Sequence, residues 1–170
     1  MTAYSYTLLQ NSSPWIPGEV ITVGAYFNIA DTTSSAGVVS GDTITANNII
    51  PEGGVTILSV LVTGAEMDTN ASPTGTYKVG DADDLGRFIL AAAQGTNVAS
   101  GQLVQYQNVA PTFSTGVQTK GVGYQYNTTE NSNSDGGFVD LVNSITASPA
   151  TAATSGVTYL YVTYACTGNV

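Results

Sequence analysis

The chain has no histidine and one cysteine, and these shortages remove several kinds of chemistry. Without histidine there is no Ser–His or Cys–His nucleophile pair and no imidazole to bind a metal ion. Cys166 has no second cysteine for a disulfide within the chain, so we expect it to pack as a small apolar side chain. Phosphate-binding and dinucleotide-binding glycine motifs are also absent from the sequence. The sequence therefore predicts a protein that is not an enzyme and needs no cofactor.

Basic residues are scarce as well: three Lys and Arg stand against twelve Asp and Glu, for a formal net charge of −9 at pH 7. Such a chain can neutralise few phosphates, so we expect no nucleic-acid partner. Attachment to an anionic membrane surface is disfavoured for the same reason. No apolar run reaches the roughly 18 residues of a membrane-spanning helix, so we expect no membrane partner.

What the sequence does contain is a series of short runs rich in Val, Ile, Thr and Tyr, separated by Gly, Pro and polar residues. This pattern is typical of an all-β protein. The 170 residues fit one domain. We predict a single jelly roll or β-sandwich of about eight antiparallel strands. The expected strands are Glu19–Ile29, Gly41–Ala46, Val55–Thr63, Thr76–Val79, Phe88–Ala93, Val122–Tyr126, Phe138–Ile145 and Val157–Tyr164.

Three local patterns predict more about these strands. Val55–Thr63 has apolar residues at both odd and even positions, so we expect a central strand that is covered on both faces. Gly24 interrupts its strand and indicates a β-bulge. Tyrosines recur at alternate positions, so each pair shares one face of a strand, in Tyr124/Tyr126 and Tyr159/Tyr161. These rings either pack within the protein or form an exposed aromatic face for a sugar or a protein.

Residues Met1–Pro17 have the character of an extended N-terminal arm that precedes a domain of residues 18–170. The segment has no charged side chain, and the only tryptophan lies between two prolines. This composition is typical of a segment that is buried against protein. The tryptophan either covers one end of its own core or anchors the arm on a neighbouring subunit. The candidate partner contacts are Tyr4, Tyr6, Trp15 and Ile16.

An acidic turn within Thr76–Ile89 is the most distinctive local motif, because it places Arg87 close to three carboxylates. Gly80 and Gly86 suit a tight turn, and the planar guanidinium can bond one carboxylate with two hydrogens. The sequence predicts a strand–turn–strand corner that is clipped by an ion pair. The residues predicted to form this corner are Asp81, Asp83, Asp84 and Arg87.

The same turn opens like a calcium-binding loop, with Asp81 and Asp83 at alternate positions and Gly86 at the sixth. Leu85 occupies the fifth position and Ala92 the twelfth, and neither supplies the side-chain oxygen that a calcium loop uses there. A calcium site at Asp81 and Asp83 is therefore a weaker alternative to the structural corner.

Five segments with recognisable turn and strand residues follow one another along the chain: Gly41–Ile44, Ile50–Val60, Val79–Ile89, Gly123–Tyr126 and Gly156–Tyr164. Taken in this order, they resemble the small jelly-roll decoration proteins of tailed bacteriophages, also called cement or head-stabilisation proteins. The resemblance covers roughly Gly41 to Tyr164, and each motif is weak alone because it consists of turn residues. The N-terminal arm, Leu103–Lys120 and Asn127–Gly137 depart from the family pattern.

The resemblance implies a non-enzymatic virion protein on the outer surface of the capsid. Such proteins clamp neighbouring major capsid proteins and stabilise the expanded head, often as homotrimers. The implied partners are the major capsid protein and further copies of the chain. A carbohydrate-binding or adhesion module on a virion or tail is the alternative, because one fold supports both functions. A minor tail or fibre component is a third possibility.

Overall fold

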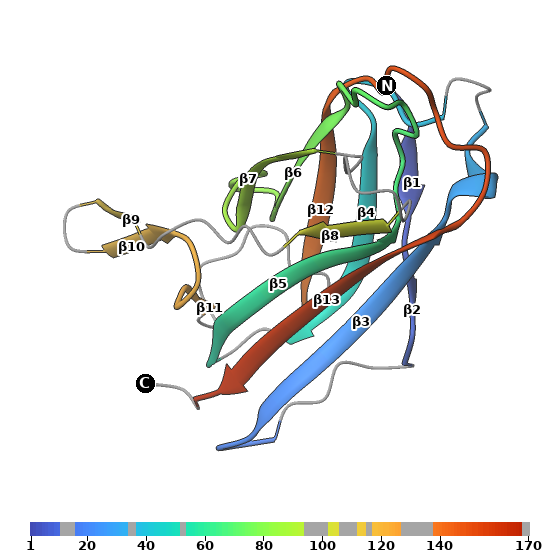
Figure 1. Cartoon of the computed structure of the whole chain (residues 1–170). Helices are drawn as coiled ribbons and strands as arrows, with labels where there is room; N and C mark the ends of the chain where they lie inside the picture. The colour runs from blue at the N-terminus through green and yellow to red at the C-terminus, as the bar shows by residue number, and fades with distance from the viewer. Residues whose placement is uncertain are drawn as a thin grey trace.

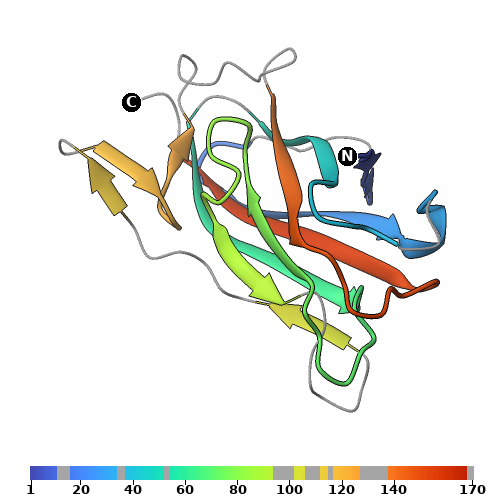
Figure 2. The ribbon, with the colours of Figure 1, turned by 90° about the horizontal axis from the view of Figure 1, so that it is seen from above.

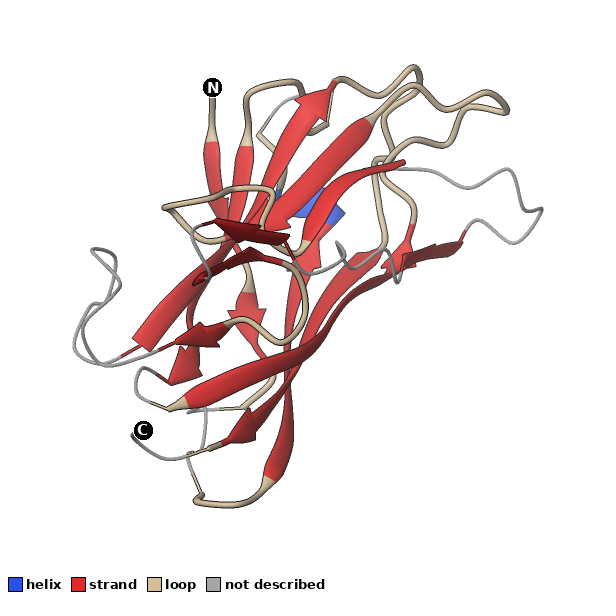
Figure 3. Ribbon diagram, turned by 90° about the vertical axis from the view of Figure 1, so that its left-hand side faces the viewer, coloured by secondary structure: helices blue, strands red, loops and turns tan. Residues whose placement is uncertain are grey.

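The computed structural model describes residues 1–10, 16–33, 37–51, 54–93, 102–105, 112–114, 117–126 and 138–167. Two curled β-sheets pack face to face and form a β-sandwich (Figures 1 and 2). The helical content of the described residues is one short 3-10 turn, η1 (Ile29–Asp31), which stands out against the strands in Figure 3. None of the helices in these residues is long and apolar enough to cross a membrane. The all-β prediction is confirmed.

One sheet has five strands, and its outermost member comes from the start of the chain. Four of the strands pair antiparallel, whereas β1 runs parallel to β4. In spatial order the strands are β1 (Ala3–Ser5), β4 (Thr43–Pro51), β12 (Phe138–Ala147), β6 (Thr76–Gly80) and β7 (Ile89–Ala93).

The other sheet has six strands, with β13 at its centre. Both neighbours of β13 pair with it along nearly its whole length. The path across this sheet is β11 (Gln125–Tyr126), β5 (Val55–Ala65), β13 (Val157–Cys166), β3 (Val20–Asn28) and β2 (Thr7–Leu8), and β8 (Gln102–Gln105) pairs with the far end of β5. A separate hairpin of β9 (Thr112–Ser114) and β10 (Val117–Lys120) projects from the sandwich (Figure 1).

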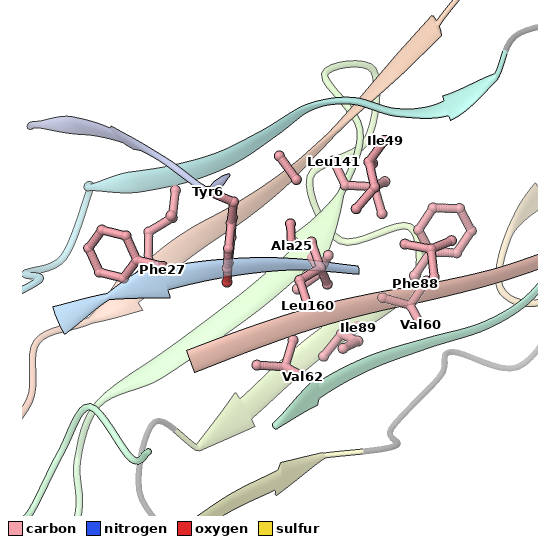
Figure 4. Packing of buried hydrophobic residues seen from close by; sticks show 14 of the residues in the cluster. Tyr6, Ala25, Phe27, Ile49, Val60, Val62, Phe88, Ile89, Leu141 and Leu160 are labelled. Carbon is pink, nitrogen blue, oxygen red and sulfur yellow. The ribbon is translucent and has the colours of Figure 1, made fainter. Parts of the chain in front are cut away.

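The core lies between the two sheets and follows the alternation of the strands. On β13 every second side chain points inward and is buried, including Leu160, Val162 and Tyr164. Figure 4 shows Leu160 among core residues from both sheets, with Val62 on β5 and Leu141 on β12. The alternation of residues that predicted β13 therefore also determines which of its side chains are buried.

Two sequence-based expectations about the six-stranded sheet are wrong. Strand β5 is not covered on both faces, because a register shift turns Leu58 outward, where it is 42% exposed, and Leu61 is half-buried. Gly24 is not a bulge, since β3 keeps an unbroken register with β13. A Cβ atom at Gly24 would instead lie 2.6 Å from the ring of Tyr161. The glycine leaves room for a ring on the outer face.

The start of the chain belongs to the sandwich, so the interpretation of Met1–Pro17 as a separate arm is wrong for its first eight residues. Strands β1 and β2 pair with β4 and β3, and the Tyr4 and Tyr6 side chains are 9% and 5% exposed. Both rings pack against Phe27, and the Tyr6 hydroxyl accepts a hydrogen bond from Asn143 Nδ2 at 3.1 Å. These two tyrosines are core residues because the segment alternates inward and outward along the sheet edges, and they are not available as partner contacts.

The two remaining residues predicted as arm contacts have different positions. Ile16 is 52% exposed, just before the turn that leads into β3. Trp15 lies outside the described residues, so the choice between its two interpretations stays a prediction.

Replacing Tyr6 should therefore destabilise the isolated domain. We expect Tyr6→Ala to lower the free energy of unfolding by about 3–5 kcal/mol, because the change leaves a cavity in the core and leaves Asn143 without its acceptor. Leu9→Ala is the matched control nearby, and since Leu9 is half exposed we expect a loss under about 1 kcal/mol. Denaturant unfolding measures both, and equal small effects would restore the arm interpretation.

Candidate functional site

The acidic turn between β6 and β7 is built around a buried ion pair. Arg87 Nε donates to Asp81 Oδ2 at 2.6 Å, and Arg87 Nη2 donates to Asp81 Oδ1 at 3.1 Å. Both side chains are buried. The turn is tight because a Cβ atom at Gly80 would lie 1.9 Å from the carbonyl oxygen of Asp84. Glycine is therefore required there, and the two-pronged geometry fixes the guanidinium in one orientation.

Tyr124, just before β11, and Tyr126, within β11, complete this cluster. The Tyr126 hydroxyl donates to Asp81 Oδ2 at 2.6 Å, and the guanidinium carbon of Arg87 lies 4.1 Å from the centroid of the Tyr124 ring. Burial raises the pKa of Tyr126 well above its ordinary value, and the Asp81 carboxylate raises it further. Burial alone would lower the pKa of Arg87, but the hydrogen bond and charge of Asp81 outweigh this and raise it. The arginine therefore stays charged and the phenol stays neutral.

The structure separates the four residues predicted for the corner. Asp81 and Arg87 form the buried pair, while the Asp84 carboxylate accepts a hydrogen bond from the Gly86 N–H at 3.0 Å and shapes the turn. Asp83 is exposed. No local pattern predicted the contact with Tyr126, because Tyr126 is 45 positions from Asp81 in the chain.

The geometry of Asp81 also bears on the calcium alternative. Its Oδ1 accepts bonds from Arg87 Nη2 and the Asp84 N–H, and its Oδ2 accepts from Arg87 Nε and the Tyr126 hydroxyl. A calcium ion takes six to eight oxygen ligands. Within the described ranges, no group of three or more His, Cys, Asp or Glu side chains is placed to hold a metal ion. With a guanidinium already bound to the carboxylate, the arrangement favours the structural corner.

A second buried carboxylate, Asp68, lies in the loop after β5, and no motif in the sequence predicted it. Its side chain is fully buried and accepts five backbone N–H groups at distances of 2.8–3.2 Å. Three donors belong to the loop between β5 and β6, and two belong to the loop between β12 and β13. The donors are the N–H groups of Asn70, Thr74, Gly75, Ala150 and Thr151.

These hydrogen bonds decide the charge state of Asp68. Burial alone would raise the pKa of this carboxyl, but the N–H donors, with Gly75 the largest contributor among them, outweigh burial and lower the pKa to about 2. The carboxylate is therefore charged at any ordinary pH and holds two loops together. The one local signal is the Asp68-Thr69-Asn70 sequence, which suits a turn in which the carboxylate accepts a nearby backbone N–H.

The two tyrosine pairs have different positions. Tyr126 is buried and Tyr124 is partly buried beside the ion pair, so this pair packs within the protein. Tyr159 and Tyr161 are half-buried on the outer face of the six-stranded sheet, with ring centroids 6.0 Å apart and ring planes within 16° of parallel. In the described part of the chain, Tyr159 and Tyr161 thus form a partly exposed aromatic surface.

Comparison with known proteins gives two structural similarities. One is to a chain of the capsid asymmetric unit of cyanophage Pam1, with a TM-score of 0.58 and 24% sequence identity over 92% of this chain and 91% of that chain. The other is to a chain of the capsid of Ralstonia phage GP4, with a TM-score of 0.55 and 17% identity over 99% of both chains. No family model and no curated protein sequence matches. At these identities the similarities show a shared fold.

Removing the guanidinium should leave a buried charge without its partner. We expect Arg87→Ala to lower the free energy of unfolding by about 3–5 kcal/mol, because Asp81 stays buried and loses two of its donors. Lys78→Ala is the matched control, since Lys78 is a half-buried basic residue on the adjacent strand, and we expect a loss under about 1 kcal/mol. Denaturant unfolding provides the comparison. A calcium-dependent rise in melting temperature that Asp81→Asn abolishes would contradict the structural assignment.

The Asp68 site should make stability depend on pH. Because the folded-state pKa lies below the ordinary value, the carboxylate adds stability above about pH 4 and loses it as pH falls toward 2. The shift corresponds to about 2 kcal/mol. We expect the stability difference between the wild type and Asp68→Asn to shrink by this amount between pH 5 and 2, as followed by urea unfolding. Asp31→Asn, at an exposed position, is the control. A difference that stays constant with pH would contradict the assignment.

Proposed function

We propose that this protein is a non-enzymatic structural component of a phage virion, which lies on the outer surface of the capsid and clamps neighbouring major capsid proteins. One observation carries the proposal: the fold is shared over nearly the full length of both chains with capsid components of two phages. Coverage of this kind indicates that the similarity extends over the whole fold of this chain and is not confined to a local motif.

A protein bound at this position would help the capsid to resist outward force. A head packed with DNA is under pressure, and a subunit that bridges several capsid proteins opposes their separation. Binding that favours the assembled shell stabilises it by mass action. Weak contacts repeated by symmetry give a high combined affinity. We include a homotrimer in the proposal, because a closed cyclic assembly can match a symmetric lattice position.

A carbohydrate-binding function is the second candidate, and the observation that favours it is the parallel pair of rings at Tyr159 and Tyr161. A sugar platform needs its rings open to solvent. Tyr161 instead lies closely over Gly24, and both Tyr159 and Tyr161 are half-buried. These contacts favour a protein partner over a sugar ring.

The test is co-sedimentation of the purified protein with expanded heads assembled from the major capsid protein of the same phage. We expect saturable binding, together with heads that resist heating and dilution better than undecorated heads. Sedimentation velocity on the free protein measures its oligomeric state, with a trimer expected. Failure to bind heads, combined with specific binding on a glycan array, would replace this proposal with the carbohydrate one.

A further inference from the structure

Large apolar side chains gather on the outer face of the six-stranded sheet. Tyr159 and Tyr161 lie on this face together with Tyr26, which pairs with Tyr159 across β3 and β13. Three exposed aliphatic side chains lie along the same sheet, and they are Leu9, Val20 and Leu58. Leu9 lies beside Gly24, where an added Cβ atom would be 2.8 Å from its side chain. We call this surface the tyrosine face, made of Leu9, Val20, Tyr26, Leu58, Tyr159 and Tyr161.

The tyrosine face is free of charge in a protein that carries fifteen charged residues. None of the six strands of this sheet contains an Asp, Glu, Lys or Arg. The nearest charges in sequence are acidic and lie at the strand ends: Glu19 directly precedes β3, Glu66 directly follows β5, and Asp31 ends the turn after β3. The strands of this face are therefore uncharged along their length, and acidic residues flank their ends; we call Glu19, Asp31 and Glu66 the acidic rim. This matches the usual anatomy of a protein interface.

The central rings are held in place before any partner arrives. Tyr161 lies against Gly24 and Leu9, and Tyr159 is parallel to Tyr161 and close to Gly64, where a Cβ would be 3.0 Å from its ring. Side chains that are already fixed lose little conformational entropy on binding, so more of the contact energy contributes to affinity.

The outer side of β5 also carries incompletely covered apolar side chains. Leu58 and Leu61 lie on this side, and none of the described elements covers them fully. A partner docked on the tyrosine face would supply the second covered side.

The acidic rim identifies the kind of partner. Two copies of the chain placed face to face would bring Glu19, Asp31 and Glu66 of one copy toward the same carboxylates of the other, and like charges at a rim disfavour association. A surface with an apolar centre and a basic rim would meet the face with complementary charge. We propose that the tyrosine face docks on such a surface, and, resting on the proposed function, that this surface belongs to the major capsid protein.

The experiment compares two leucines on opposite outer faces. Leu58 is 42% exposed on the tyrosine face, and Leu90 is 58% exposed on β7 of the five-stranded sheet. We expect Leu58→Glu to weaken binding to expanded heads by about tenfold or more, because it places a charge on a face whose strands otherwise carry none. Leu90→Glu should bind within about twofold of the wild type. Circular dichroism melting of both variants checks that each is folded, and Val20→Glu serves as a second variant if Leu58→Glu is not.

Salt dependence tests the rim. Raising NaCl from about 0.05 to 0.5 M should weaken wild-type binding, because screening reduces attraction between an acidic rim and a basic one. Binding that is insensitive to salt would overturn the charge part of the inference.

The other outcomes also separate the hypotheses. If the wild type fails to bind heads, the proposed function is wrong. If the wild type binds and Leu90→Glu loses affinity while Leu58→Glu does not, the proposed function stands and the five-stranded sheet is the docking side. Equal binding by all three proteins, or a wild-type oligomer that Leu58→Glu breaks into monomers in sedimentation velocity, also overturns the inference. In the last case the face joins copies of this chain.

Discussion

A buried carboxylate must be met by hydrogen-bond donors or by a positive charge, and this constraint organises both ends of the sandwich. Asp68 follows β5 and precedes β6, where five backbone N–H groups surround it. Asp81 follows β6, where Arg87 and Tyr126 bind it. Since β11 pairs with the beginning of β5, the second site lies at the opposite end of the same strands. Each carboxylate thereby joins segments that are far apart in the chain.

The two sites solve the same problem with different donors. Asp81 has a guanidinium partner, so burying the pair removes two charges from water. Well-aligned hydrogen bonds between Asp81 and Arg87 are needed to offset this desolvation free energy. Asp68 has only amide dipoles, yet five of them lower its pKa to about 2. Amide donors come from loop backbone, so they hold the loops themselves in shape. The result is a chain whose connections are fixed by charge at the ends while the sheets between them carry almost none.

Local patterns in the sequence predicted the features that depend on neighbouring residues. The alternation of Val157–Tyr164 predicted β13, and the six-residue spacing of Asp81 and Arg87, with a glycine directly before each of them, suited the observed turn. Features that depend on distant residues could not be predicted. The donors from Ala150 and Thr151 to Asp68 are backbone groups, which any residue type provides, and they lie 82 and 83 positions away.

The start of the chain shows a different reason for failure. Strands of two and three residues, such as β2 and β1, are too short to show a period, so their aromatic residues suggested an arm. The same composition serves equally well for an edge strand, because both uses bury apolar side chains against protein. The pairing of β1 with β4 and of β2 with β3 distinguishes an edge strand from an arm, and no local pattern in the sequence predicts this pairing.

The loops held by Asp68 and by the Asp81–Arg87 pair also affect how the uncharged six-stranded sheet could bind a partner. If the loops that connect the strands were free to move, the outer face of the six-stranded sheet would change shape, and a partner would have to order it at a cost in entropy. Asp68 holds the loops at one end down to a pH of about 2, and the Asp81–Arg87 pair holds the other. The outer face of the six-stranded sheet therefore lies between two sets of connections that are each held by a buried carboxylate, and this arrangement lowers the entropy that a partner would have to remove on binding.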